Sequence, residues 1–134
     1  MPMAIDHFRE AVRLLPDDGQ ACFNLGLALA RAGRDPEAIG ILRRARELRW
    51  DEVSTLLLLA SELRRVGNET DARATVEELL ASQPQVADGQ FLLGEILRDA
   101  GDIVGARARF REALRLRPNW SPPREALQKL DASP

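Results

Sequence analysis

The segment FREALRL at residues 110–116 nearly repeats the segment FREAVRL at residues 8–14, which lies 102 residues earlier. This offset is three times 34, and a shift of 34 residues brings the whole chain into register with itself. The aligned columns are Gly33, Gly67 and Gly101; Ala4, Ala38, Ala72 and Ala106; Leu25, Leu59, Leu93 and Leu127; Leu29, Leu63 and Leu97; and Gly26, Ala60 and Gly94. A fixed period of this length is typical of stacked-repeat architectures.

Each 34-residue unit has helical apolar spacing on both sides of its glycine. Leu25 and Leu29 precede Gly33 by helical steps, and Ala38 and Leu42 follow it with the same spacing. We therefore expect a first helix, a turn closed by the glycine in a left-handed conformation, and a second helix.

Proline and aspartate residues indicate where the predicted helices begin and end. In the first full unit, Asp35 is expected to cap the second helix and Pro36 to occupy its first turn. Pro16, Pro84 and Pro118 fall between units, where a helix must stop. Since no alternating run of β-branched residues predicts a strand, the chain is expected to be all-α.

Small residues indicate how the two helices of a unit meet. Gly26 and Gly94 in first helices, and Ala45 and Ala113 in second helices, allow two helix axes to approach closely. One helix pair cannot cover its own apolar face, so neighbouring pairs must stack. We expect one domain over residues 1–134, made of a half repeat (1–18, second helix only), three repeats (19–52, 53–86 and 87–120) and a C-terminal capping helix (121–134).

The pattern resembles the tetratricopeptide repeat. The signature positions of that family fall on Cys22, Leu25, Gly26, Leu29, Ala38, Leu42 and Trp50; on Leu56, Leu59, Ala60, Leu63, Ala72, Val76 and Pro84; and on Gln90, Leu93, Gly94, Leu97, Ala106, Phe110 and Pro118. Aliphatic residues replace several of the usual aromatics. The resemblance implies a right-handed α-solenoid of stacked helix-turn-helix 34-residue repeats. It also implies a non-catalytic scaffold that binds a peptide or partner helix in a concave groove lined by the first helices.

A helical wheel predicts which residues of the first helices line this groove. They are Phe23, Leu27 and Arg31; Leu57, Ser61, Arg64 and Arg65; and Phe91, Glu95 and Arg98. Phe23, Leu57 and Phe91 lie one repeat apart and should form an apolar ladder with arginines at its rim. Contiguous exposed apolar area marks a binding surface. The alternative is that the three residues are packing residues covered by neighbouring helices.

The residue types in this set predict the chemistry of the partner. For one subset of the family, the resemblance implies a clamp in which Lys, Arg and Asn side chains of the groove bind a C-terminal carboxylate. Here Phe23, Leu27, Leu57 and Phe91 occupy the corresponding stretches. We therefore expect a protein or peptide with apolar anchors and acidic flanks, whose carboxylates would pair with the arginines.

The N-terminal helix corresponds to a second helix without its first helix. One of its flanks, with Ile5, Phe8, Val12 and Leu15, is therefore expected to be bare. Three explanations compete: the chain is a fragment of a longer array, which we favour, a second copy pairs with the flank, or a partner fills the gap. The alternative functions are accordingly a self-associating assembly module and a regulatory segment of a larger enzyme.

Composition argues against other function classes. Nineteen basic residues against twenty-one acidic ones make nucleic-acid binding unlikely. His7 is the only histidine, Cys22 shares the core column of Leu56, and no ligand spacing predicts a metal or cofactor site, so we expect no enzyme. The longest apolar run, residues 56–60, is too short to span a membrane, and the N-terminus has no signal-peptide pattern. A cytoplasmic location is expected.

Overall fold

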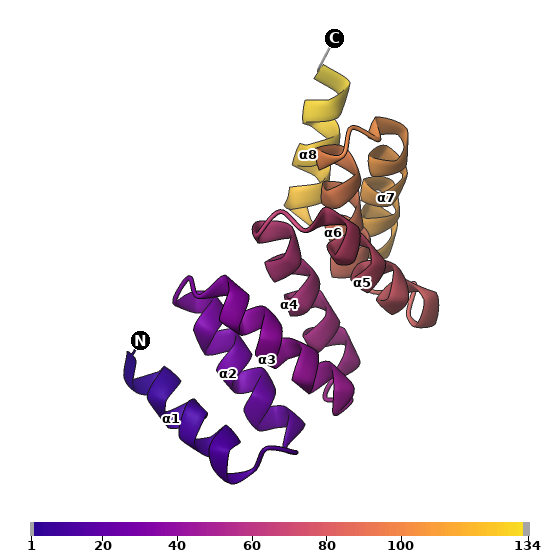
Figure 1. Cartoon of the computed structure of the whole chain (residues 1–134). Coiled ribbons are helices and arrows are strands. Elements are labelled where there is room, and N and C mark those ends of the chain that lie inside the picture. Colours follow the sequence, from indigo (N-terminus) through magenta and orange to yellow (C-terminus); the bar gives the residue numbers. More distant parts are fainter. Residues whose placement is uncertain (1, 133–134) are drawn as a thin grey trace. The chain divides into compact units, whose positions relative to one another are not determined.

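The computed structural model describes residues 2–132, with side chains from residue 4 onward, and this part of the chain is built from helices alone. The helices are α1 (Pro2–Leu14), α2 (Gly19–Arg31), α3 (Asp35–Glu47), α4 (Glu52–Arg65), α5 (Glu69–Ser82), α6 (Ala87–Asp99), α7 (Ile103–Leu116) and α8 (Ser121–Ala132). They fall into two compact units, with α1 to α4 in the first and α5 to α8 in the second (Figure 1). The expectation of an all-α chain is confirmed.

In the first unit each helix packs on the next one along the chain, and α2 also contacts α4 (Figure 1). The helix pair α2 and α3 falls within predicted repeat 19–52. The buried apolar side chains of this unit include Ile5 of α1, Cys22, Leu25 and Leu29 of α2, Ile39 and Leu42 of α3, and Leu56, Leu59 and Leu63 of α4. The leucines of α2 and α4 in this set are at positions that the 34-residue columns predict to be internal.

In the second unit α5 packs on α6, α6 on α7 and α7 on α8. Its buried apolar residues include Val76, Leu79, Leu93, Ile96, Leu97, Phe110, Ala113 and Ala126. The pair α6 and α7 falls within predicted repeat 87–120, and α8 begins at the predicted start of the capping helix. The helices of predicted repeat 53–86 belong to different units, α4 to the first and α5 to the second.

The glycine turns take the left-handed conformation that the sequence predicts. Gly33, Gly67 and Gly101 have φ angles of 75°, 85° and 86°. At the first of these turns the Gly33 N–H donates to the Ala30 carbonyl at 3.0 Å, and the Arg34 N–H donates to the Leu29 carbonyl at 2.9 Å. This bonding pattern closes α2 by satisfying carbonyl groups that the helix end leaves unpaired.

The prediction that Asp35 caps α3 is wrong. The capping position belongs to Arg34, whose side chain makes no capping hydrogen bond, and Asp35 is the first residue of the helix. The Arg34 N–H donates the last hydrogen bond that closes α2, so α3 begins at Asp35, one residue earlier than expected. Asp35 instead turns its carboxyl group toward α4, where it lies against Glu62.

Two glycines of the first helices set the distance to the second helices. A Cβ atom at Gly26 would lie 2.6 Å from Leu42 Cδ2, and one at Gly94 would lie 2.6 Å from Phe110 Cε1. Leu42 and Phe110 are completely buried. The predicted close approach of the paired helices is therefore confirmed at both glycines.

Gly94→Ala is expected to lower the free energy of unfolding by about 1–3 kcal/mol, because overpacking against Phe110 outweighs the gain of roughly 1 kcal/mol in helix propensity. The matched control is Gly40→Ala in α3, where nothing lies within 4 Å of the new Cβ. This control should raise the free energy of unfolding by about 0.5–1 kcal/mol. Chemical denaturation measures both values, and equal effects of the two substitutions would contradict the close-contact interpretation.

Arg49→Gly is expected to stabilise the protein by about 1 kcal/mol, because Arg49 occupies the left-handed region at a φ of 58°. The backbone N–H groups of Arg49 and Trp50 close α3 with the same hydrogen-bonding pattern that closes α2 at Gly33. In the reverse experiment, Gly33→Ala should cost about 1 kcal/mol although nothing lies within 4 Å of its Cβ. Thermal unfolding distinguishes the two variants; stabilisation by both, or by neither, would argue against backbone strain at Arg49.

Candidate partner-binding surface

In the first unit the predicted groove residues lie on α2 and α4, two helices in contact with each other. Phe23 and Leu27 of α2 and Leu57 of α4 are half-buried. They are neither core residues nor fully exposed side chains. Half-buried apolar side chains on adjacent helices leave part of their area available to a partner.

Polar and charged side chains accompany these apolar residues in the first unit. Ser61 and Arg64 are half-buried, while Arg31 and Arg65 are exposed. Arg65 Nη2 lies 3.9 Å from a carboxyl oxygen of the buried Glu62. The predicted groove residues of this unit carry three positive charges and no negative one.

In the second unit Phe91, Glu95 and Arg98 of α6 are all half-buried. The Phe91 ring lies 5.5 Å from the Phe110 ring and 5.2 Å from the Trp120 ring, measured between centroids. Phe91 therefore belongs to an aromatic cluster and has less free area than an isolated side chain. Since Phe23 and Leu57 lie in the other unit, a continuous ladder of the three residues stays a prediction.

Arg98 is engaged within its own helix. It lies 3.9 Å from Glu95 and 3.8 Å from Asp99, and its guanidinium carbon is 5.9 Å from the centre of the Phe110 ring. A partner carboxylate would have to compete with these contacts.

The helical wheel missed two residues beside this cluster. Trp120 packs on Phe91 from the segment before α8, and Arg117 stacks on Trp120 with its guanidinium carbon 4.2 Å from the ring centre. Arg117 also pairs with Asp88 at 3.3 Å. Both residues lie between α7 and α8, so the alignment of first helices does not include them.

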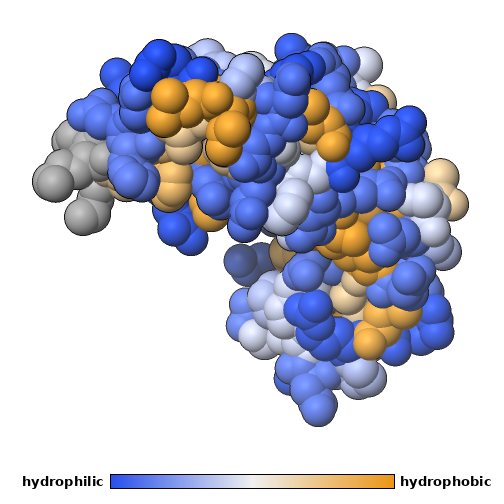
Figure 2. Space-filling model, turned by 90° about the horizontal axis from the view of Figure 1, so that it is seen from below, coloured by the Kyte–Doolittle hydropathy of each residue, from blue (hydrophilic) through white to orange (hydrophobic). Residues whose placement is uncertain are grey.

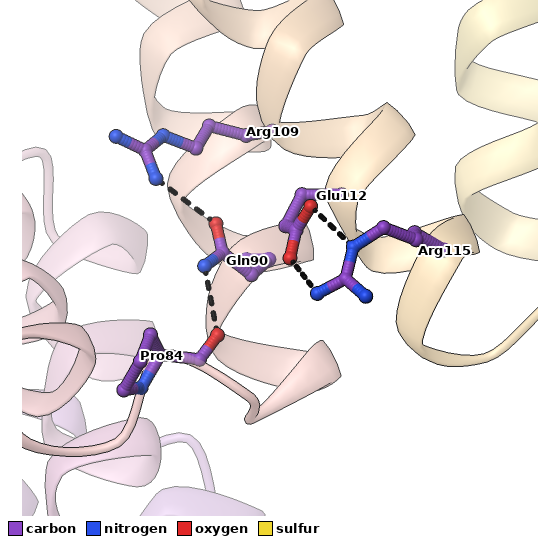
Figure 3. Close-up of polar contacts among 5 residues, drawn as sticks. All are labelled: Pro84, Gln90, Arg109, Glu112 and Arg115. Carbon is purple, nitrogen blue, oxygen red and sulfur yellow. Dashed lines mark hydrogen bonds and ion pairs between the residues drawn. The ribbon is translucent and has the colours of Figure 1, made fainter.

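A hydrogen-bond network fixes the start of α6 close to this cluster (Figure 3). The buried Gln90 donates from Nε2 to the Pro84 carbonyl at 3.0 Å and accepts at Oε1 from Arg109 at 3.1 Å. On the next turn of α7, Arg115 pairs with Glu112. Because Gln90 is satisfied at both ends of its amide, it ties the loop before α6 to α7.

The predicted self-association flank of α1 is only partly exposed. Ile5 is buried against the unit, so it is not available to a second molecule. Phe8 and Val12 are half-buried, whereas Leu15 is 58% exposed. Leu14, which the sequence analysis did not single out, is 63% exposed.

The cysteine of the chain lies in the core of the first unit. Cys22 is fully buried, and burial raises the pKa of its thiol, which disfavours the nucleophilic thiolate. Within residues 4–132 no three His, Cys, Asp or Glu side chains are grouped so as to hold a metal ion. Among the described helices, none has the length and apolar character that crossing a bilayer requires.

One face of the molecule, shown in Figure 2, carries hydrophobic residues in separate patches bordered by hydrophilic ones. Besides Leu14 and Leu15, the large apolar residues that are exposed in the described part of the chain are Val66, Ile103 and Val104. Scattered apolar residues of this kind are normal on a folded surface. They provide matched controls for substitutions in the groove.

Comparison with solved structures identifies the same fold in several proteins. A crystal structure of MamA superimposes with a TM-score of 0.86 over 94% of this chain and 74% of that one, at 16% identity. YrrB, described as a tetratricopeptide repeat protein with an unusual peptide-binding site, gives 0.86 over 92% and 64%, at 20% identity. The first such domain of Spaghetti, bound to an HSP90 peptide, gives 0.79 over 84% and 90%, at 17% identity.

Sequence comparison gives the same result. Tetratricopeptide repeat protein 7B of Mus musculus and of Homo sapiens is 37% identical over 78 residues, and superkiller protein 3 of Schizosaccharomyces pombe is 36% identical over the same length. The match covers 58% of this chain but only 9% and 6% of those proteins. The tetratricopeptide repeat family model matches residues 3–53 and 57–119. The chain therefore belongs to the tetratricopeptide repeat family.

Proposed function

We propose that the chain is a non-catalytic scaffold that binds a peptide or a partner helix along the outward face of its first helices. The repeat fold supports a protein-interaction role, because structural neighbours include proteins described with a peptide-binding site or a bound peptide. Such a fold positions side chains without a reactive centre.

The pair of half-buried residues Phe23 and Leu57 carries this proposal. They occupy the same repeat position on the contacting helices α2 and α4, and each keeps part of its side chain accessible. Partly exposed aromatic and aliphatic residues on adjacent helices suit the apolar anchors of a helix or an extended segment. In the second unit Phe91 and its neighbour Trp120 form a separate aromatic surface that suits an apolar anchor.

Charge determines which partner fits this face. Arg31, Arg64 and Arg65 accompany the apolar residues of the first unit, and no acidic residue belongs to the same set. A partner with Asp or Glu beside its apolar anchors would gain charge-assisted hydrogen bonds there. A basic partner would meet like charges and bind more weakly.

Selection from a random peptide library tests the proposal with a defined probe. We expect the selected peptides to combine aromatic or aliphatic anchors with Asp or Glu, and their affinity to fall as salt rises. Phe23→Glu should weaken the best peptide at least tenfold, because it places a carboxylate where an apolar anchor sits. Isothermal titration calorimetry measures these affinities.

Val104→Glu is the matched control, since Val104 is 80% exposed on α7 and outside the proposed surface. It should leave peptide affinity unchanged. Enrichment of basic peptides, or equal affinity for the wild type and the Phe23→Glu variant, would overturn the proposal. Crosslinking in native extract with the same two variants extends the test to natural partners.

Self-association through α1 is a second candidate function, favoured by the adjacent exposed residues Leu14 and Leu15. If a second copy covers them, sedimentation should detect a concentration-dependent dimer of the wild type. Replacing both leucines by lysine should then abolish that dimer by introducing like charges across the interface. A wild type that stays monomeric over the whole concentration range tested would exclude this function for the chain.

A further inference from the structure

Glu62 is a charged residue at a core position. It lies on α4, in the repeat column that holds Ile96 on α6, and it is 1% exposed while Ile96 is 2% exposed. An ionised carboxylate without water or donors is very unfavourable at such a position. The surroundings of Glu62 therefore decide its protonation state.

The group that meets Glu62 is a second carboxyl, that of Asp35 at the start of α3. The two side chains are within hydrogen-bonding reach of each other. Glu62 Oε2 and Asp35 Oδ1 are both buried, and neither has a hydrogen-bond donor among the described residues. Ionised carboxylates only accept hydrogen bonds, so these two oxygens can bond to one another only when one of them carries a proton.

The other charges nearby do not neutralise this carboxyl pair. Arg65, on the same helix as Glu62, reaches it only at 3.9 Å and is largely exposed, so solvent screens the attraction. On α3, Glu37 is paired with Arg9 at 2.7 Å and with Arg34 at 3.5 Å, and it is not among the groups that act on Glu62.

Helix α2, which also contacts α4, contributes little to the charge around Glu62. Its titratable groups are Cys22 and Arg31, and neither acts on Glu62. Burial is the largest effect on Glu62, and the hydrogen bond and charge of Asp35 act in the same direction, while Arg65 opposes them. Together they raise the pKa of Glu62 to about 7.

We propose that Glu62 and Asp35 form a proton-dependent latch, in which one shared proton between the two buried carboxyl groups holds α4 against α3 and the loss of that proton loosens the contact. The latch lies within the first unit, on the helix that also carries Leu57, Ser61 and Arg64. It depends on the α3–α4 packing alone and does not require that the outward face bind a peptide.

The sign of the pH dependence follows from linkage. In the unfolded chain Glu62 ionises near its ordinary pKa of 4.5, whereas in the folded protein its pKa is about 7. Between these values the folded state holds one more proton, so stability is fully present below the lower value and is lost as pH rises through the upper one. From pH 6 to pH 8 the folding equilibrium constant should fall roughly tenfold, which lowers the unfolding midpoint by on the order of 5 °C.

Thermal unfolding of the full chain between pH 5.5 and pH 8.5 tests this prediction in a His7→Gln background. That background removes the only histidine of the chain, so no imidazole contributes to the measured slope. Glu62→Gln should remove the pH slope between pH 6 and pH 8, because the amide donates to Asp35 without a titrating proton. The matched control Glu125→Gln, at an exposed position on α8, should keep the slope.

Carbon-13 NMR of the glutamate side-chain carboxyls measures the titration directly in the folded wild type. One signal should titrate with a midpoint near 7, and the Glu62→Gln substitution should remove that signal. Asp35→Asn should lower this midpoint, because its amide supplies a donor to the Glu62 carboxylate. A wild type in which every glutamate titrates near 4.5, or a Glu62→Gln variant that keeps the full slope, would overturn the proposal.

Discussion

The close approach of the two helices within a repeat is the constraint on which the other features depend. Leu42 fills the space that Gly26 leaves on α2, and Phe110 does the same at Gly94 on α6. Leu42 and Phe110 are completely buried, so each glycine and its large partner fix the distance between their two helices. The position of each first helix then fixes which of its residues face outward and can contact a partner.

Two buried polar residues show how differently the repeat tolerates departures from an apolar core. Gln90 occupies the column of Cys22 and Leu56, yet both ends of its amide are bonded, to Pro84 and to Arg109. Glu62 occupies the column of Ile96 and lies against the carboxyl of Asp35, while the exposed Arg65 is 3.9 Å away. Gln90 rigidifies the second unit, because its satisfied amide connects a loop to a helix. Glu62 makes the packing of the first unit dependent on a proton.

The candidate surface could be predicted from the sequence only in part. Helical spacing predicts that Phe23, Leu27 and Leu57 face outward, and in the structure all three are half-buried. It cannot indicate that Phe91 packs against Trp120, because the tryptophan comes from a segment between helices that has no counterpart in the aligned columns. The same limit applies to Ile5, which periodicity assigns to a bare flank and which packing on α2 buries.

The sequence by itself determined the helices, their glycine turns and the pairing of small with large residues. These are local or periodic properties, and a period of 34 residues repeats them often enough to be read directly. The tertiary structure alone decided which polar groups meet. Asp35 reads as a helix cap in the sequence, but it lies one residue inside α3 and faces Glu62 of the next repeat. Contacts between residues far apart in the chain depend on how the helices pack, and no local pattern encodes them.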